Sequence, residues 1–394
     1  MKTLDEVDLQ GKRVFMRVDF NVPLDKERRV KDDLRIRAVL PSIQKVLESG
    51  GRLILASHLG RPKGKVAPEF SLAPAAEQLS KLMSRPVALA PDCIGPEVDK
   101  MAAQLSAGEL LLLENLRFHP EEEKNDPGFS KLLAALADVY VNEAFAASHR
   151  AHASVEGITK FAPVCAAGYQ LQKEIEYFRK AMDNPRRPMA IIVGGAKVSS
   201  KLGLLENLIP RTDYLIIGGA MANTFFKARG LETGKSLVED DFVEKAAQLL
   251  AAGGRKGVKM LLPVDVVVAP DETAGDQARQ VPVESVPPDL RILDIGDRTV
   301  EAFETALKSC RTIIWNGPMG VFETPPFNKG TFALAEFMGS LDALTIVGGG
   351  DSASAVRQAG AQDKVSYIST GGGAFLEMLE GKQLPGVLAL ESRQ

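Results

Sequence analysis

The chain has 394 residues, with 48 Lys and Arg against 51 Asp and Glu and a formal net charge of -3. This length allows two domains, and the near-neutral charge excludes a generally basic surface for nucleic acid. The three cysteines, Cys93, Cys165 and Cys310, are far apart, which argues against a disulfide framework and indicates the cytoplasm. With neither a signal-peptide pattern nor an apolar run long enough to span a bilayer, we expect a soluble protein with no membrane contact.

In the first half, short apolar runs alternate with amphipathic helical patterns, such as the one over residues 36–47. This alternation is typical of βαβ units and predicts a mainly parallel sheet covered by helices. The runs cover residues 14–18, 53–56, 110–113 and 139–141.

The second half repeats this organisation and predicts a second sheet. Residues 170–182 have the pattern of a connecting helix, and the prolines of the following DNPRRP segment end it, so we place the domain junction there. The apolar runs cover residues 190–193, 214–217, 260–262, 311–315, 344–347 and 365–368.

Polar and basic side chains follow the apolar runs of the first half. Open parallel sheets bind ligands at the carboxyl ends of their strands, and arginine forks match phosphate or carboxylate oxygens. A single arginine of this kind is more often a solvated surface ion pair, but the shared position after strands favours an anion site. Asp19 is either an acceptor for a substrate hydroxyl or the ion-pair partner of an arginine. The set comprises Asp19, Asn21, His58, Arg61, Arg117 and Arg150, together with Arg35 at the start of a helix.

The histidines of the first half do not form a recognisable metal motif. His149 and His152 are three residues apart, but an HExxH arrangement is missing and no cysteine is near in sequence, so zinc is not expected there. We interpret His119 as a loop histidine.

Four apolar runs of the second half lead into glycines, in IIVGGAKVSSK, LIIGGAMANT, TIVGGGDSAS and SYISTGGGAF. Glycine lets a backbone approach a ligand closely, and helix N-termini offer free amides to phosphates, although a single such pair is more often a tight turn. The GxGxxA pattern that starts at Gly348 lacks the acidic residue about 20 positions later that a dinucleotide requires. The GLETGKS segment is one residue short of a P-loop and is interpreted as an ordinary loop.

Several polar residues flank these glycines. Lys197 and Lys201, four residues apart, are expected on one face of a helix, directed at the same anion or merely solvated. Asp351 is expected either to contact magnesium held by nucleotide phosphates or to cap a helix. Asn316 follows a strand, and Glu323 could accept hydrogen bonds from a ribose.

Taken together and in this order, RVDFNVP, SHLGRP, ENLRFHPEEE, SHRAHAS, GGAKVSSK, WNGPMGVFE, GGGDS and STGGGAFLE resemble the phosphoglycerate kinase family over essentially the whole chain. The resemblance implies an α/β fold with two Rossmann-like three-layer α/β/α domains of mainly parallel sheets, facing each other across a cleft. It implies a 3-phosphoglycerate-binding domain over residues 1–169, a linker helix over 170–187, a nucleotide-binding domain over 188–376, and a segment over 377–394 that returns to the first domain.

The resemblance also assigns roles to residues. The first-half set Asp19, Asn21, Arg35, His58, Arg61, Arg117 and Arg150 matches the substrate-binding positions of the family. The nucleotide-binding positions are Lys201, Gly195, Gly219, Asn316, Glu323, Gly349, Gly350, Asp351 and Ser352, with Asp351 as the magnesium ligand. The catalytic positions are Arg35, Lys197, Lys201, Gly371, Gly372 and Gly373.

The implied activity is reversible, Mg2+-dependent phosphoryl transfer between 1,3-bisphosphoglycerate and ADP, giving 3-phosphoglycerate and ATP, by a monomer whose domains close around the linker helix. Glu143, Ala146 and Ser148 stand where the family usually has Asp, Gly and Ala. These departures leave open a catalytically silent nucleotide-binding scaffold of the same fold. A nicotinamide-dependent dehydrogenase is the enzymatic alternative, although it requires the missing ribose carboxylate.

Overall fold

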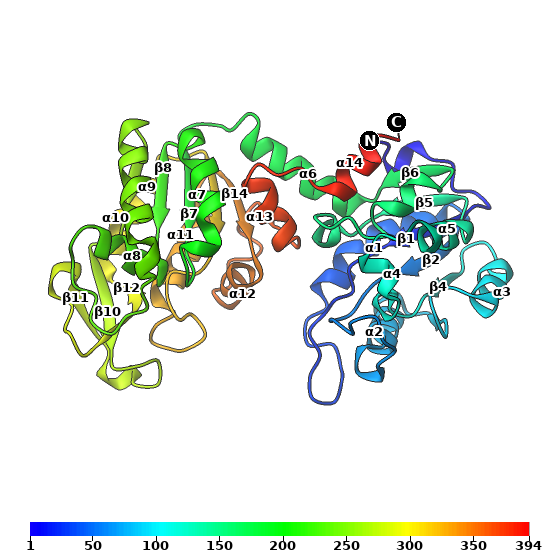
Figure 1. Ribbon diagram of the computed structural model, residues 1–394, viewed down its shortest axis with the longest axis horizontal. Helices are drawn as coiled ribbons and strands as arrows, with labels where there is room; N and C mark the ends of the chain where they lie inside the picture. The colour runs from blue at the N-terminus through cyan, green and yellow to red at the C-terminus, as the bar shows by residue number, and fades with distance from the viewer. Residues whose placement is uncertain (394) are drawn as a thin grey trace. The chain divides into compact units, whose positions relative to one another are not determined.

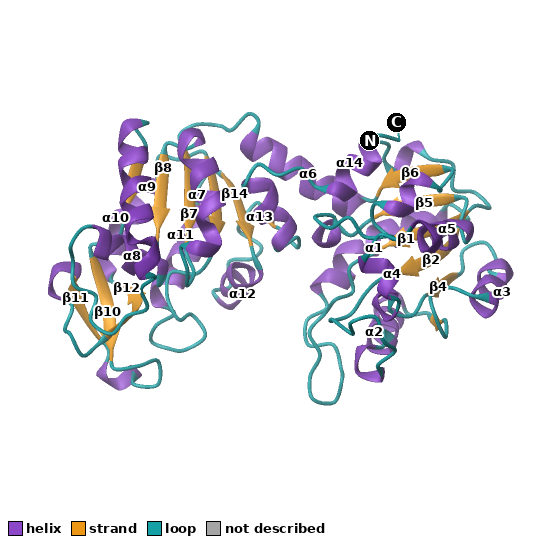
Figure 2. Cartoon of the chain, viewed as in Figure 1, coloured by secondary structure: helices purple, strands orange, loops and turns teal. Residues whose placement is uncertain are grey.

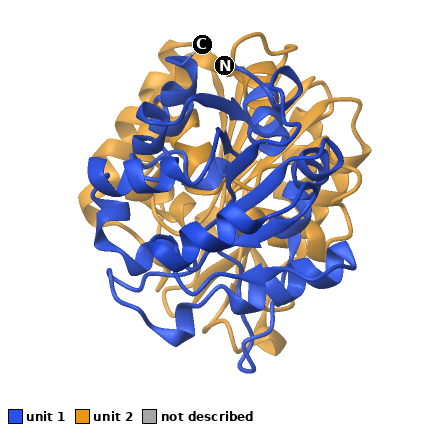
Figure 3. Ribbon diagram, turned by 90° about the vertical axis from the view of Figure 1, so that its right-hand side faces the viewer, with its two compact units in different colours: residues 1–176, 383–394 blue, residues 177–382 orange. Residues whose placement is uncertain are grey.

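The computed structural model describes residues 1–393 and separates into two compact units. Unit 1 contains Met1–Glu176 and the last residues from Gln383, and unit 2 contains Tyr177–Lys382 (Figure 3). The division falls inside helix α6 (Tyr169–Met182), which corresponds to the connecting helix expected at residues 170–182. The segment that returns to the first domain was expected to begin at residue 377, but it begins at Gln383. Residue 377 lies inside α13 (Gly373–Leu379), which belongs to unit 2 and is tied to it by a hydrogen bond from Asn207 Nδ2 to Leu379 O at 2.6 Å.

Unit 1 is built around a six-stranded sheet in the order β3-β4-β2-β1-β5-β6 (Figure 1). Each neighbouring pair is parallel. The chain leaves β1 toward β2 and leaves β5 toward β6 on the other side, so the topological switch point lies between β1 and β5. The strands are β1 (Arg13–Arg17), β2 (Arg52–Ala56), β3 (Ala88–Leu89), β4 (Leu110–Leu112), β5 (Val139–Asn142) and β6 (Val164–Ala167).

Helices pack around this sheet (Figure 2). Apolar residues of β1, β2, β4 and β5 form one buried cluster with Ile36, Val39, Ile43 and Val46 of α1. These positions recur every three to four residues, which is why this segment forms a helix with one buried face. The helices are α1 (Leu34–Glu48), α2 (Ala73–Met83), α3 (Pro96–Gln104), α4 (Pro120–Glu123), α5 (Pro127–Ala135) and α14 (Pro385–Glu391).

The last helix, α14, completes unit 1 from the far end of the chain. It contacts β6, and the amide of Gly386 donates to Ser148 O at 2.9 Å. Arg393 Nη2 donates to Ala162 O at 2.7 Å. Figure 1 shows α14 beside the strands of unit 1.

Unit 2 contains a second parallel sheet in the order β15-β14-β13-β7-β8-β9. Strands β7 and β13 are buried along their whole length, so both faces of the sheet centre are covered. The switch point lies between these two strands. The strands are β7 (Met189–Val193), β8 (Tyr214–Ile217), β9 (Lys259–Leu261), β13 (Thr312–Asn316), β14 (Leu344–Gly348) and β15 (Tyr367–Ile368).

A small antiparallel sheet in the order β11-β10-β12 is added to unit 2 and was not predicted. Its strands are β10 (Asp265–Ala269), β11 (Arg279–Pro282) and β12 (Arg291–Ile295). The helices of unit 2 are α7 (Leu202–Leu208), α8 (Met221–Ala228), α9 (Val243–Arg255), α10 (Asp297–Leu307), α11 (Lys329–Ser340), α12 (Gly350–Gln358) and α13.

The predicted α/β class with two mainly parallel sheets is confirmed. Within residues 1–393, no helix combines the length and apolarity that a bilayer crossing requires.

Candidate functional site

The basic residues predicted in unit 1 follow the carboxyl ends of its parallel strands. Asp19 and Asn21 follow β1, His58 and Arg61 follow β2, and two arginines follow β4 and β5. Because the strands are parallel, these ends lie along one edge of the sheet. Arg117 lies in a short 3-10 helix, η3 (Leu116–Phe118), and Arg150 lies in the loop after β5.

Asp19, Asn21 and Arg35 form one network. Arg35 Nη1 donates to Asp19 Oδ2 at 2.8 Å and to Asn21 O at 3.1 Å. Asn21 Oδ1 accepts from the amide of Gly60 at 2.9 Å, which fixes the loop that carries Arg61. Asp19 is therefore the ion-pair partner of an arginine, one of the two interpretations that the sequence left open.

His58 is held as a neutral imidazole by a buried arginine. Arg17 Nη2 lies 3.0 Å from His58 Nδ1, and because a guanidinium only donates, Nδ1 accepts and the ring proton is on Nε2. Burial, followed by the charge of Arg17, lowers the pKa of His58 well below its ordinary value. His58 can therefore donate from Nε2 to an anion.

Arg117 is a buried cation near both arginines and acids, and its Nε lies 3.4 Å from Glu123 Oε1. Its side chain is 5% exposed, and Nη1 donates to Gly60 O at 3.0 Å. Burial, with a further contribution from Arg17, lowers the pKa of Arg117 to about 10. A bound anion would relieve both effects, so this position is electrostatically prepared for one.

The loop after β5 is supported by a buried acid that the sequence did not reveal. Ser154 Oγ donates to Glu122 Oε1 at 2.6 Å and accepts from Arg17 Nε at 2.8 Å. Glu122 Oε1 also lies 3.8 Å from His152 Nδ1, and burial lowers the pKa of His152 to about 3. Arg17, Glu122 and Ser154 thus connect β1 to the loop of Arg150, and no local sequence pattern indicates this connection.

The three positions that depart from the usual family residues lie in the first part of this loop. Burial raises the pKa of Glu143 to about 7, and its carboxylate accepts from the amides of Gln170 and Leu171 at the start of α6. Ser148 Oγ donates to Ala144 O at 3.0 Å, and Ala146 is partly exposed. Glu143 and Ser148 thus serve local structure.

In unit 2, the loops after β7, β8 and β13 approach one another through their backbones. A Cβ atom on Gly219 would lie 2.5 Å from the amide nitrogen of Gly195, and Gly219 has φ +68°. A Cβ atom on Gly317 would lie 2.2 Å from Gly194 O. Only glycine allows this packing, which explains why the apolar runs end in glycines.

These loops line a pocket of about 250 Å³ within unit 2. It is bordered by the buried Asp294 of β12, whose pKa burial raises to about 8. Four predicted nucleotide-binding residues lie on its wall, namely Gly195, Gly219, Glu323 and Asp351.

The other predicted nucleotide-binding residues are linked beside the pocket by hydrogen bonds. Lys201 Nζ donates to Asn316 Oδ1, and Asn316 Nδ2 donates to Gly348 O at 2.6 Å. Ser352 Oγ accepts from the amide of Gly317 at 2.6 Å. Burial lowers the pKa of Lys201, while the nearby carboxylate of Asp351 opposes that shift.

Three sequence interpretations of this region need correction. Lys197 and Lys201 do not share a helix face, because Lys197 is exposed in the loop after Gly195 and α7 begins only after Lys201. Asp351 is not the cap of α12, since that position is Gly349 with φ +97° and Asp351 lies in the first turn. Asn316 is the last residue of β13 rather than the residue after it.

The glycines at 371–373 lie next to the turn before α12. Strands β14 and β15 are neighbours, and Phe375 of α13 packs so closely on Gly348 that a Cβ there would lie 2.3 Å away. Gly372 caps α13 with φ +47°, and Gly373 is exposed.

The structure thus brings together the predicted residues in two groups, one in each unit. Side-chain contacts hold Asp19, Asn21, Arg35, His58 and Arg117 in place. Arg61 and Lys197 are exposed and, among residues 1–393, make no side-chain hydrogen bond or ion pair.

Comparisons with known proteins show which family the chain belongs to. The profile described as phosphoglycerate kinase matches residues 4–382. A phosphoglycerate kinase from Syntrophobacter fumaroxidans is 71% identical and covers 99% of this chain and 98% of its own length. The cytosolic phosphoglycerate kinase of Triticum aestivum is 55% identical over 99% of this chain and 98% of its own. The solved structure of phosphoglycerate kinase from Coxiella burnetii has a TM-score of 0.88 at 41% identity, over 99% of this chain and 98% of that one. The chain belongs to the phosphoglycerate kinase family.

Proposed function

We propose that unit 1 binds 3-phosphoglycerate or 1,3-bisphosphoglycerate through Asp19, Asn21, Arg35, His58, Arg61, Arg117 and Arg150. As a member of its family the chain is a kinase, so the proposal concerns which residues act. The observation that carries it is the convergence of Arg17, Arg117 and a neutral His58 after the strands of unit 1, with Glu122 and Glu123 as the neighbouring acids. A small, multiply charged anion is the ligand that such a cluster favours.

The nucleotide, ADP or ATP, is assigned to the pocket of unit 2. Gly195 and Gly219 border it with backbone, and Glu323 is exposed on its wall, where it can accept from ribose hydroxyls. The remaining contacts are assigned to Lys201, Asn316, Gly349, Gly350 and Ser352, around the start of α12.

The Mg2+ ion that accompanies the nucleotide is assigned to Asp351. Its carboxylate is exposed, lines the pocket and, within the described residues, has no hydrogen-bond or ion-pair partner. Magnesium is usually held by one or two carboxylates together with substrate phosphates, so this free carboxylate fits. Bound there, Mg2+ would neutralise phosphate charge.

The reaction proceeds by direct in-line transfer from the acyl phosphate to ADP, without a covalent enzyme intermediate. Catalysis therefore consists of positioning and of meeting the negative charge on the transferring group. We assign that role to Arg35, Lys197, Lys201 and the backbone of Gly371, Gly372 and Gly373.

Because the two substrates are assigned to different units, transfer requires the units to close in the ternary complex, bending around α6. Closure also excludes water, which would otherwise hydrolyse the acyl phosphate. Small-angle scattering with both substrates bound should show a smaller radius of gyration than the free protein, and an unchanged radius would contradict closure. A monomer in the cytoplasm is the assigned state, and gel filtration with light scattering tests it.

The decisive experiment is a coupled assay with ATP, Mg2+ and 3-phosphoglycerate. We expect turnover that requires all three components. Binding of ATP without turnover would instead indicate the silent scaffold that the substitutions at Glu143, Ala146 and Ser148 left open. A fluorescence titration with NADH is expected to show no saturable binding, and saturation would favour the dehydrogenase alternative.

A further inference from the structure

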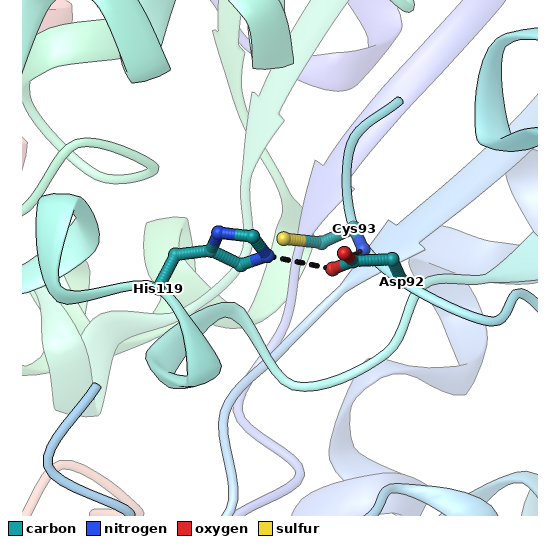
Figure 4. A group of neighbouring side chains, drawn as sticks. All are labelled: Asp92, Cys93 and His119. Carbon is teal, nitrogen blue, oxygen red and sulfur yellow. Dashed lines mark hydrogen bonds and ion pairs between the residues drawn. The ribbon is translucent and has the colours of Figure 1, made fainter. Parts of the chain in front are cut away.

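Three potential metal ligands converge in unit 1 outside the candidate substrate site. Asp92 and Cys93 lie in the loop between β3 and α3, and His119 precedes α4. One ligand atom from each residue lies within 4.8 Å of the other two. Figure 4 shows the Cys93 sulfur beside the His119 ring and the Asp92 carboxylate.

Hydrogen bonds and a ring contact hold Asp92 and His119 in place. His119 Nε2 lies 2.7 Å from Asp92 Oδ1, and the amide of Glu114 donates to Asp92 O at 3.3 Å, which ties the loop to the segment after β4. The His119 ring stacks on Phe129, with centroids 5.4 Å apart. Its plane and the direction of Nε2 are therefore largely fixed.

We propose that Asp92, Cys93 and His119 bind a divalent cation of the Zn2+ type, with water as the fourth ligand. Zinc bonds to carboxylate oxygen, imidazole nitrogen and thiolate sulfur at about 2.0 to 2.3 Å, which places tetrahedral ligands roughly 3.5 Å apart. The pair at 2.7 Å must separate by about 0.8 Å, and a pair at the 4.8 Å limit would have to contract by about 1.3 Å. The Asp92 side chain is 43% exposed, and its Oδ1 can exchange the hydrogen bonds from His119 Nε2 and the Cys93 amide for the metal.

The ligand set selects against the Mg2+ that the nucleotide carries. A thiolate and an imidazole suit Zn2+, whereas Mg2+ prefers oxygen ligands and retains its water. Binding replaces the thiol proton of Cys93, which leaves to solvent, and it also requires His119 Nε2 to give up the proton that it donates to Asp92 Oδ1, so that the neutral ring is protonated on Nδ1.

Solvent reaches the cluster through two of its three members. The His119 side chain is 24% exposed and Asp92 more so, whereas Cys93 is fully buried and forms the floor. A metal can therefore enter from the surface, and the open side leaves room for water.

The test is a Co2+ titration of the full-length, metal-free protein, followed by displacement with Zn2+. We expect one Co2+ per chain, a near-ultraviolet thiolate-to-cobalt absorption band, and loss of that band when Zn2+ is added. The band should vanish in Cys93→Ser and persist in Cys310→Ser, which removes another buried free thiol. Absence of the band in the wild type, or its survival in Cys93→Ser, would overturn the proposal.

Two further variants keep the test valid if Cys93→Ser fails to fold. Asp92→Asn and His119→Gln change partly exposed side chains, and each should weaken Zn2+ binding by at least about tenfold. Wild-type Zn2+ affinity in both variants would show that the cluster is only a hydrogen-bonded loop contact.

Discussion

Unit 1 forms its candidate site from arginine and histidine side chains, whereas unit 2 forms its site from loop backbones that pack too closely for any side chain. In unit 1, a buried guanidinium and a neutral imidazole are held by specific hydrogen bonds. In unit 2, glycines allow the backbones of three loops to lie in direct contact with one another. Two similar sheets thus support two kinds of site, and substitutions should affect them differently.

The largest expected effect is that of Arg35→Ala. This change removes a cation assigned to the transferring phosphoryl group and leaves Asp19 without its ion-pair partner. We expect kcat in the coupled assay to fall by about 10²- to 10³-fold. The matched control is Arg37→Ala on the same helix, where an exposed arginine pairs with Asp33, and its kcat should be unchanged. Near-normal turnover of Arg35→Ala would remove Arg35 from the catalytic role.

The backbone character of the unit 2 site is tested by Gly219→Ala. A methyl group there would collide with the amide of Gly195, so we expect ADP affinity, measured by calorimetry, to fall by at least about tenfold. Gly230→Ala is the control, because Gly230 also has positive φ but nothing lies within 4 Å of an added Cβ. Gly230→Ala should lose about 1 to 2 kcal/mol of stability because of its positive φ, and Gly219→Ala should lose more because of the added collision. Equal ADP affinity in the two would mean that close loop packing does not shape the pocket.

A more modest effect is expected from Asp351→Asn. Loss of the carboxylate charge should raise the Mg2+ concentration needed for half-maximal turnover by about tenfold, while binding of 3-phosphoglycerate is unchanged. Asp363→Asn, at an exposed position after α12, is the matched control. An unaltered Mg2+ dependence in Asp351→Asn would assign the ion elsewhere.

The smallest effect on activity is expected from replacing one buried carboxyl group in each unit. These replacements should instead change how the stability of the protein depends on pH. Burial raises the pKa of Glu143 to about 7 and of Asp294 to about 8. A raised folded-state pKa means that the folded protein binds more protons, so stability falls as pH rises from the unfolded pKa, about 4, through these values. Glu143→Gln and Asp294→Asn should each reduce the decrease in unfolding free energy between pH 5 and about 9, as measured by denaturant titration. If the unfolding free energy of both variants fell with pH as steeply as that of the wild type, the raised pKa values of Glu143 and Asp294 would be contradicted.

The sequence predicted the central strands because buried parallel strands are continuous apolar runs. It did not predict β3, β6 or the antiparallel strands: Ala88–Leu89 is only two residues long, β6 has just four residues, and β11 is polar and largely exposed. Residues such as Arg117 were predicted because they follow strands that end at one edge of the sheet. Glu122 was missed because its link to Ser154 spans 32 residues without a local pattern. The proximity of Cys93 to His119 is likewise a product of tertiary structure.

The return of α14 to unit 1 has a consequence for biosynthesis. Ser148 and Ala162 receive hydrogen bonds from Gly386 and Arg393, residues translated only after all of unit 2. On the ribosome, the first unit to emerge is therefore the last to be completed. Its nascent form leaves the surface that α14 later covers without that helix until residues 385–391 have been synthesised.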